Sequence, residues 1–241
     1  MNFTSVVRKF MRKAGFDIVR FDFLTNPIAR RLHLMTRYKI NLIFDVGANI
    51  GQFANAMRKN GYTGRIVSFE PLSSAFARLK EKAKNDDLWE CVNIGLGNYE
   101  GKAIINIAGN SQSSSILDIL PAHLQAAPES CYIGKEEIMI TTVDSIINRY
   151  YHDGDKAFLK IDTQGYERYV LEGIQSSHDP IIGIQLEMSF EPLYEGELLF
   201  SNMIDYMSAK GFTLMSIEPI LTNPKTGQLL QVDGIFFRRF R

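Results

Sequence analysis

From residue 41 onward, short apolar runs alternate with amphipathic segments along the chain. The apolar runs predict buried strands, and the segments between them show the spacing of helices. This alternation is typical of βαβ units that build a mainly parallel sheet. We expect five main strands at 41–46, 65–69, 89–93, 157–161 and 181–186, with helices at about 52–59, 73–84, 166–172 and 200–210.

Two departures from the alternation add detail to this α/β fold. Between the third and fourth strands, 101–107 and 138–142 read as extra strands around a Ser/Gly/Pro-rich stretch, 109–134, which is a candidate lid or substrate loop. Near the C-terminus, 213–217 and 234–238 predict an antiparallel strand pair that closes the sheet. The sequence therefore predicts one doubly wound domain over residues 41–241. Gly61 and Gly211 follow two helix ends, where a left-handed residue is commonly needed.

Residues 1–40 differ from the rest in charge, with nine Lys and Arg side chains against only Asp17 and Asp22. Apolar residues recur at helical spacing in the first part of this segment, at Phe3, Val6, Val7, Phe10, Met11 and Ala14. We expect a basic, helical N-terminal extension. The partner of this extension has four alternatives: an anionic membrane surface, a lipid-linked acceptor, the chain's own domain or a dimer mate.

Composition narrows the class of protein. The chain of 241 residues is 45% hydrophobic and 22% charged, as in a soluble globular protein, and its net charge of zero gives no global electrostatic reason to bind nucleic acid. Cys91 and Cys131 show neither metal-site nor disulfide-framework spacing, and no apolar window is long enough for a membrane span. We expect a cytoplasmic protein, or one held at the inner face of the membrane.

The strongest local signal is the segment 42–51, an apolar strand that runs into a glycine turn and then a helix. Gly47 and Gly51 allow close approach of the backbone to a ligand, and the helix N-terminus offers unpaired N–H groups. A dinucleotide site would prefer G-x-G-x-x-G, whereas here Asn49 lies inside G-x-x-x-G and Asp45 precedes the turn. A carboxylate there repels a pyrophosphate but suits the ammonium and sulfonium charges of S-adenosyl-L-methionine.

Two further strand ends carry groups that a nucleoside needs. Glu70 ends the second strand, where it can accept hydrogen bonds from both ribose hydroxyls, and Pro71 stops that strand. After the third strand, Asn93, Gly95 and Leu96 leave room for an adenine against the backbone. These positions complete the predicted cofactor site.

Several of these motifs, taken together, resemble the FkbM family of methyltransferases over most of residues 42–238. The matching stretches are 45–51, 69–71, 113–115, 142–145, 159–167, 185–187, 192–194 and 232–236. The resemblance implies an S-adenosylmethionine-dependent O-methyltransferase that acts on a hydroxyl, often of a sugar in a polysaccharide, a glycolipid or a natural product. Where that family frequently has Glu, this chain has Gln164, which puts a catalytic or metal-binding carboxylate at that position in doubt.

The fourth and fifth strands supply candidates for the chemistry. Asp162 should face the same crevice as Asp45 and Glu70, because the ligand crevice lies at the carboxyl ends of the strands. A sugar hydroxyl needs a base as the new bond forms, so Asp162 is our first candidate and Glu187 the second. Lys160 lies on the same strand face as Asp162, so it either positions an acceptor oxygen or forms an ion pair with Asp162.

Alternatives remain open for several side chains. Asp162 could instead cap a helix or bind only cofactor. Ser113, Ser114 and Ser115 are candidate contacts for acceptor hydroxyls. A divalent metal held by Asp162 and Glu187 is a further alternative, but we expect no metal, because hard-ion sites usually show more carboxylates close in sequence. The four histidines have no paired spacing, so we expect each to be a surface or loop residue rather than a base or ligand: His33, His123, His152 and His178.

Two rival functions follow from the same fold. One is a nicotinamide-dependent oxidoreductase, and the missing glycine pattern argues against it. The other is a non-catalytic scaffold that keeps the cofactor site, with Gln164 as its one hint.

Overall fold

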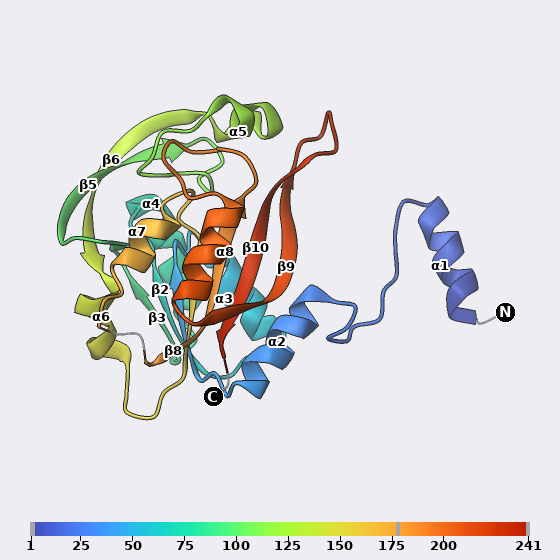
Figure 1. Cartoon of the computed structure of the whole chain (residues 1–241), viewed down its shortest axis with the longest axis horizontal. Coiled ribbons are helices and arrows are strands. Elements are labelled where there is room, and N and C mark those ends of the chain that lie inside the picture. Colours follow the sequence, from blue (N-terminus) through green and yellow to red (C-terminus); the bar gives the residue numbers. More distant parts are fainter. Residues whose placement is uncertain (1–2, 177–178, 240–241) are drawn as a thin grey trace.

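The computed structural model describes residues 3–176 and 179–239, and this part of the chain is built around a seven-stranded sheet (Figure 1). The strand order is β3-β2-β1-β7-β8-β10-β9. Neighbouring strands are parallel except that β10 runs antiparallel to both β8 and β9. The strands are Leu42–Val46 (β1), Arg65–Phe69 (β2), Trp89–Val92 (β3), Ala157–Ile161 (β7), Ile181–Ser189 (β8), Phe212–Thr222 (β9) and Leu229–Arg238 (β10).

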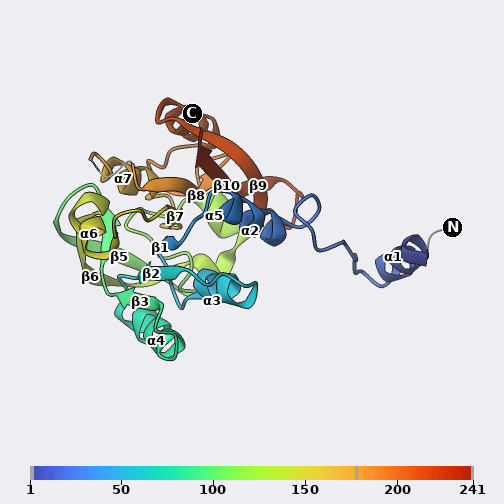
Figure 2. The same ribbon diagram turned by 90° about the horizontal axis from the view of Figure 1, so that it is seen from below.

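Helices cover both faces of this sheet (Figure 2). Ile43 and Phe158 point into an apolar cluster with α2 and α3, whereas Phe44 and Leu159 point into a second cluster with α6, α7 and α8. Neighbours in a strand face opposite sides, which explains why these pairs separate. The helices are α2 (Pro27–Arg37), α3 (Gln52–Lys59), α4 (Ser73–Ala83), α6 (Val143–Tyr150), α7 (Glu167–Glu172) and α8 (Phe200–Ala209).

A second, smaller sheet interrupts the alternation after β3. Its order is β4-β6-β5, with β4 at Gly95–Gly97, β5 at Gly101–Ala108 and β6 at Tyr132–Thr142. The segment between β5 and β6 carries α5 (Pro121–Ala126), and the pairing of Ile119 with Tyr194 ties it to the loop after β8. The candidate lid is therefore a segment with its own secondary structure and fixed attachments. Whether it changes order when ligands bind stays a prediction.

The predicted doubly wound α/β class is confirmed, including the antiparallel pair at the C-terminus. Gly61 and Gly211 adopt the expected left-handed backbone, with φ of +94° and +85°. Four elements were not predicted, namely β4, α5, α6 and a short 3₁₀ helix at Pro128–Ser130, and the strands β6, β8, β9 and β10 are longer than predicted. The helix α2 lies within the N-terminal extension that was predicted to be helical, but its bounds were not predicted. Strand pairing explains the extra length, because β6 follows β5 over positions that carry charged side chains and give no apolar run.

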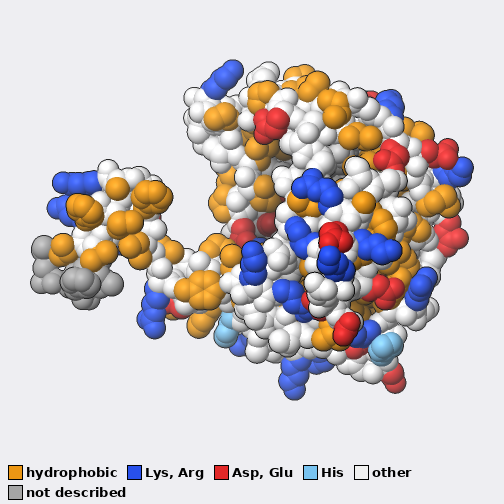
Figure 3. Space-filling view, turned by 180° about the vertical axis from the view of Figure 1, so that it is seen from behind, with side chains coloured by type: hydrophobic (Ala, Val, Ile, Leu, Met, Phe, Trp, Pro, Cys, Tyr) orange, Lys and Arg blue, Asp and Glu red, His pale blue; other side chains and the backbone are white. Residues whose placement is uncertain are grey.

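The N-terminal segment divides into two parts. The amphipathic helix α1 (Phe3–Lys13) stands away from the domain (Figure 1). The linker after it exposes Phe16, Phe21 and Leu24, and hydrophobic side chains gather on the surface of this N-terminal segment (Figure 3). In contrast, α2 packs on the domain and buries Leu34 and Met35. The boundary at residue 41 and the partner of the basic segment stay predictions. Within the described residues, no helix is long and apolar enough to cross a membrane.

The turn after β1 depends on Gly47. Its φ is +71°, and a Cβ built there would lie 1.8 Å from the carbonyl oxygen of Asp162. The backbone N–H groups of Gly47 and Ala48 both donate to the carbonyl of Phe69, at 3.0 Å. A side chain at residue 47 would therefore separate β1 from β7 at the point where both strands end.

We predict that Gly47→Ala lowers the free energy of unfolding by about 3 kcal/mol or more, from left-handed strain of roughly 1–2 kcal/mol and overpacking of roughly 1–3 kcal/mol. Gly61→Ala is the matched control, because Gly61 also has positive φ but nothing lies within 4 Å of its Cβ position. It should cost only about 1 kcal/mol. Chemical denaturation of both variants measures the difference, and equal losses would show that the close approach to Asp162 is unimportant.

Candidate functional site

A buried lysine lies at the centre of the candidate site. Lys160, in β7, is 6% exposed, and its Nζ lies 3.3 Å from Oδ1 of Asp45 and 3.1 Å from Oδ2 of Asp162. Asp45 has no exposed surface and accepts a hydrogen bond from Ser68 Oγ at 3.1 Å. The indole of Trp89 donates to the same Ser68 Oγ at 2.9 Å. Polar contacts thus run across four strands, from β3 to the end of β7.

Strand register produces this alignment. Asp45 lies opposite Ser68 of β2 on one side and opposite Lys160 of β7 on the other. Burial raises the pKa of Asp45, and the nearby ammonium opposes that shift. Burial alone would lower the pKa of Lys160, but the carboxylates of Asp162 and Asp45 raise it above its usual value. The ammonium form is therefore the one that the site holds.

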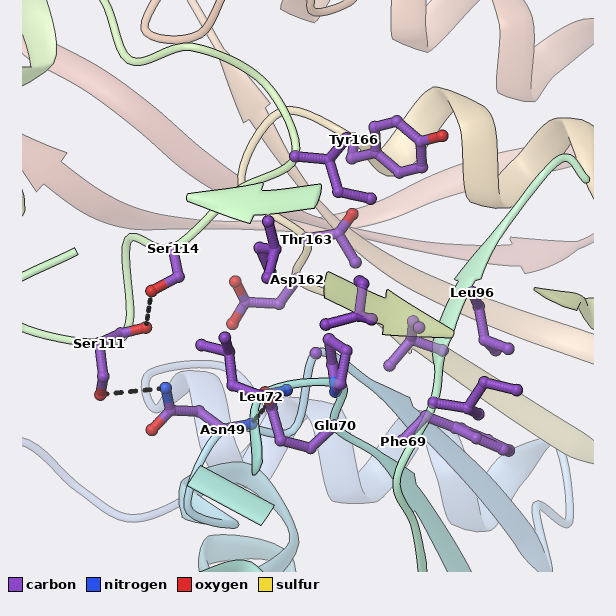
Figure 4. A pocket seen from close by; sticks show the side chains of 18 of the residues that line it. Asn49, Phe69, Glu70, Leu72, Leu96, Ser111, Ser114, Asp162, Thr163 and Tyr166 are labelled. Carbon is purple, nitrogen blue, oxygen red and sulfur yellow. Dashed lines mark hydrogen bonds between the residues drawn. The ribbon is translucent and has the colours of Figure 1, made fainter. Parts of the chain in front are cut away.

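The first of two neighbouring cavities opens at the ends of β1, β2 and β7, beside the small sheet (Figure 4). Glu70 lies at its base, 4% exposed, and accepts hydrogen bonds from the backbone N–H of Asn49 at 2.7 Å and of Leu72 at 2.9 Å. Burial raises the pKa of Glu70 to about 7, against the effect of those two donors. Apolar side chains make up much of the remaining lining, and they come from Val46, Phe69, Pro71, Leu72, Ile94, Leu96, Ile105, Ile116, Ile138 and Tyr166.

The second cavity, of about 440 Å³, is polar. Four residues line both cavities: Gly47, Asn49, Gln112 and Asp162. The floor of the second cavity consists of side chains on one face of the sheet, because residues two apart in a strand point to the same side. They come in pairs from β7 and the residue after it, from β8 and from β10: Lys160, Asp162, Gln185, Glu187, Gln231 and Asp233. A ligand that fills both cavities would thus meet Asp162 where they join.

Gln164 holds two of these carboxylates together. Its Nε2 donates to Oδ1 of Asp162 at 2.8 Å and to Oε2 of Glu187 at 2.7 Å. The hydroxyl of Tyr194 donates to its Oε1 at 2.7 Å, which fixes the orientation of the amide. Gln164 has φ of +55°, and Ser115 Oγ donates to its carbonyl at 2.6 Å. The amide supplies donors where an acidic side chain would add a third negative charge.

Glu187 and Asp233 face each other across β8 and β10, at paired register positions. Burial, with the carboxylates of Asp162 and Asp233, raises the pKa of Glu187 well above its usual value. Burial and Asp162 raise the pKa of Asp233 to about 7. The pair accepts bonds from glutamines as well, with Gln231 donating to Glu187 at 3.3 Å and Gln185 to Asp233 at 2.8 Å.

Most of the predicted site residues line one of the two cavities. The first is lined by Gly47, Asn49, Glu70, Pro71, Gly95, Leu96, Ser114 and Asp162, and the second by Gly47, Asn49, Ser113, Lys160, Asp162 and Glu187. Four predicted residues line neither cavity. They are Asp45, Gly51, Asn93 and Ser115.

These four have structural contacts that explain their positions. Asp45 reaches the cavities only through Lys160. Gly51 precedes α3 with φ of +80°, and a Cβ there would meet Leu79 and Trp89 at 2.9 Å. Asn93 donates to the carbonyls of Glu70 and Pro71, whereas Ser115 bonds to Gln164.

The histidines are placed differently from one another. His123 lies buried in α5, lines the second cavity and contacts Ser130 Oγ at 3.2 Å, so its interpretation as a surface or loop residue was wrong. His178 lies outside the described residues. In the part of the chain that the structure describes, no group of three or more His, Cys, Asp or Glu side chains is arranged to hold a metal ion.

The sequence interpretation missed Arg31, Gln185, Gln231 and Asp233. The spacing of Gln185 with Glu187 was available as a signal, because strand residues two apart share a face. Gln231 and Asp233 lie in the first half of their strand, which reaches the site only because β10 is antiparallel. Arg31 belongs to α2, a helix whose bounds the sequence pattern did not predict.

Comparison with known proteins identifies the family of this chain. Residues 45–214 match the family model described as the methyltransferase FkbM domain. The match covers well over half of the chain, and the protein belongs to the FkbM methyltransferase family.

Individual relatives are more distant. Methyltransferase sdnD of Sordaria araneosa is 25% identical over 172 residues, which cover 62% of this chain and 66% of that protein. The crystal structure of methyltransferase FkbM from Methylobacillus flagellatus has a TM-score of 0.46 and 14% identity, covering 81% of this chain and 43% of that chain. An rRNA methylase from Streptococcus thermophilus has a TM-score of 0.46 and 10% identity, covering 89% and 98%.

The buried ion pair makes a testable prediction about stability. Lys160→Met leaves the Asp45 carboxylate buried without its cation, so the free energy of unfolding should fall by about 3–5 kcal/mol. The loss should be larger at pH 8 than at pH 5. Without the ammonium to oppose burial, the folded-state pKa of Asp45 lies further above its unfolded-state value. The variant therefore loses stability as the pH rises through that folded-state pKa.

Denaturation of the variant at both pH values measures this effect. The double variant Lys160→Met with Asp45→Asn should recover most of the loss and its pH dependence, since no unpaired charge remains. Equal destabilisation of the single variant at pH 5 and pH 8 would contradict the pairing.

Proposed function

We propose that this protein is an S-adenosylmethionine-dependent O-methyltransferase that transfers a methyl group to a hydroxyl, and that the acceptor is a sugar of a polysaccharide, a glycolipid or a natural product. The observation that carries the proposal is the position of Asp162, which lines a mainly apolar cavity with a buried acid and also a polar cavity beside it. Family membership supports the methyl transfer.

The first cavity fits the cofactor. Its apolar walls suit an adenine, and Glu70 ends β2, where a ribose would lie. Both Glu70 oxygens already accept a backbone N–H, and each keeps a further acceptor position for a ribose hydroxyl. Gly47 and Gly95 bring backbone without side chains to this cavity. When bound, the cofactor supplies an electrophilic methyl group on a positively charged sulfur.

The protein's own residues must then position the acceptor and take its proton. In-line displacement needs the acceptor oxygen about 3 Å from the methyl carbon, so the two cavities have to meet at the reacting atoms. Asp162 lies at that junction, with 32% of its side chain exposed. Its carboxylate is held on one side by Lys160 and on the other by Gln164, and it accepts the hydroxyl proton as the new bond forms.

Asp162 and Glu187 both accept a hydrogen bond from Gln164, but their surroundings differ. Glu187 is more enclosed, 8% exposed, and burial raises its pKa, which favours its protonated form. The carboxylate of Asp162 is more exposed and lies 3.1 Å from the ammonium of Lys160. The structure thus favours Asp162 as the base and Glu187 as a neighbour that helps to bind the acceptor.

A non-catalytic scaffold is the competing proposal, and two variants separate it from the enzyme. Asp162→Asn keeps the bond to Gln164 but cannot accept a proton, so turnover at saturating cofactor should fall by roughly 10²–10⁴ while affinity for S-adenosylhomocysteine changes little. Glu70→Gln should instead weaken binding of S-adenosylhomocysteine, by roughly tenfold for one lost charge-assisted bond, and leave turnover at saturation nearly intact.

Calorimetry measures the affinities, and transfer of labelled methyl groups to a panel of glycosides measures turnover. Gln is the preferred replacement at residue 70, because its one oxygen can still accept from Asn49 or Leu72, whereas Ala would leave both N–H groups unpaired. A wild-type protein that binds S-adenosylhomocysteine and transfers no methyl group to any acceptor would support the scaffold. Full turnover in Asp162→Asn would show that Asp162 is not the base, and Glu187 would become the leading candidate.

A further inference from the structure

One wall of the second cavity has no part in the chemistry above. It is built by Arg31 of α2, Gln185 of β8 and Asp233 of β10. Gln185 donates to Asp233 at 2.8 Å, while Arg31 bonds to Glu218 at 2.5 Å on the neighbouring strand β9. These contacts fix three polar side chains from separate elements around one space. We name this group the α2–β10 wall.

Unmet hydrogen-bonding capacity marks this wall as a binding surface. Gln185 is 2% exposed, and its Oε1 has no hydrogen-bond partner. The Nε of Arg31 likewise has none. Buried polar atoms without partners are costly, and a ligand group that both donates and accepts would satisfy them after a small adjustment of the side chains. A hydroxyl is such a group.

The charges around the cavity restrict what that ligand can be. The lysine and the arginine in its lining are already paired with carboxylates, Lys160 with Asp45 and Asp162, and Arg31 with Glu218. Within the described part of the chain, no cation lies within ion-pair distance of the carboxyls of Glu187 and Asp233, and Glu129 lies exposed in the same lining. An entering phosphate or carboxylate would therefore meet surplus negative charge and no unpaired cation.

We propose that the second cavity binds the hydroxyl-rich end of a carbohydrate acceptor that carries no anionic group, with the α2–β10 wall holding hydroxyls that do not react. This inference rests on the proposed methyl transfer and specifies the acceptor class and three residues that recognise it. Asp233, partly open to the cavity, accepts a hydroxyl proton in a hydrogen bond, and Gln185 and Arg31 bond to its neighbours. Phosphate groups of a larger acceptor stay outside.

Ligand-observed NMR at pH 8 with S-adenosylhomocysteine present tests the charge selection. The probes are three matched sugars, methyl glucoside, methyl glucuronide and methyl glucosaminide. The neutral glycoside should give saturation transfer, and the glucuronide should give none. The glucosaminide should bind at least as well as the neutral glycoside, because the cavity has surplus negative charge. Stronger binding of the glucuronide overturns the exclusion of anions, and absence of binding by all three overturns the carbohydrate class.

A variant pair tests the wall itself. Asp233→Asn keeps the shape and the bond from Gln185 but weakens the bond to a hydroxyl, so the dissociation constant of the neutral glycoside should rise by roughly tenfold. For an acceptor that turns over, KM should rise by a similar factor with kcat little changed. Asp86→Asn is the control, because Asp86 accepts a bond from Arg58 at 2.6 Å and lines neither cavity.

Binding of S-adenosylhomocysteine to every variant verifies that the protein is folded, independently of the acceptor. If this binding is intact and Asp233→Asn leaves glycoside affinity and KM unchanged, the wall is not a recognition surface, although the methyl transfer survives. If S-adenosylhomocysteine fails to bind the wild-type protein, the proposed function itself fails. The two failures therefore give different results.

Discussion

The site depends on one buried ammonium group. The ammonium of Lys160 lies between two carboxylates, with Asp45 on its buried side and Asp162 on the side of the cavities. Both Lys160 and Asp45 are buried, so water cannot take the place of either partner. Removing the lysine leaves the Asp45 carboxylate uncompensated in the protein interior, which should be strongly destabilising. The same ammonium holds the Asp162 carboxylate at the junction of the two cavities. Stability of the core and placement of the candidate base are thus one interaction.

The other features of the site follow from strand order and direction. The sheet places β1 between β2 and β7, so the turn at Gly47, the acid at the end of β2 and Asp162 meet at one edge. On the other side of Asp162, β8 and the antiparallel β10 extend the same face with alternating Gln, Glu and Asp side chains. One edge is therefore apolar with a single buried acid, and the next is polar. That contrast suits a nucleoside cofactor beside a hydroxyl-rich acceptor.

The sequence contained enough to predict the parallel strands and their ends, because each has a local apolar run and a polar residue at its carboxyl end. Asp45, Glu70, Asp162 and Glu187 were found in this way. Contacts between distant segments could not be predicted. Arg31 reaches the cavity through α2, a helix with no long periodic pattern, and Asp233 reaches it through the reversed direction of β10. Asp45 was expected to contact cofactor directly, but burial places it behind Lys160, and sequence does not show depth within a sheet.

A crystal structure with S-adenosylhomocysteine tests the central claim most directly, since it locates the sulfur relative to Asp162. We predict the adenine between the apolar walls of the first cavity and the ribose hydroxyls on Glu70. The sulfur should lie near Gly47 and face the second cavity across the Asp162 carboxylate. A ligand bound with its sulfur turned away from Asp162, or seated in the second cavity with Glu70 uncontacted, would contradict the account.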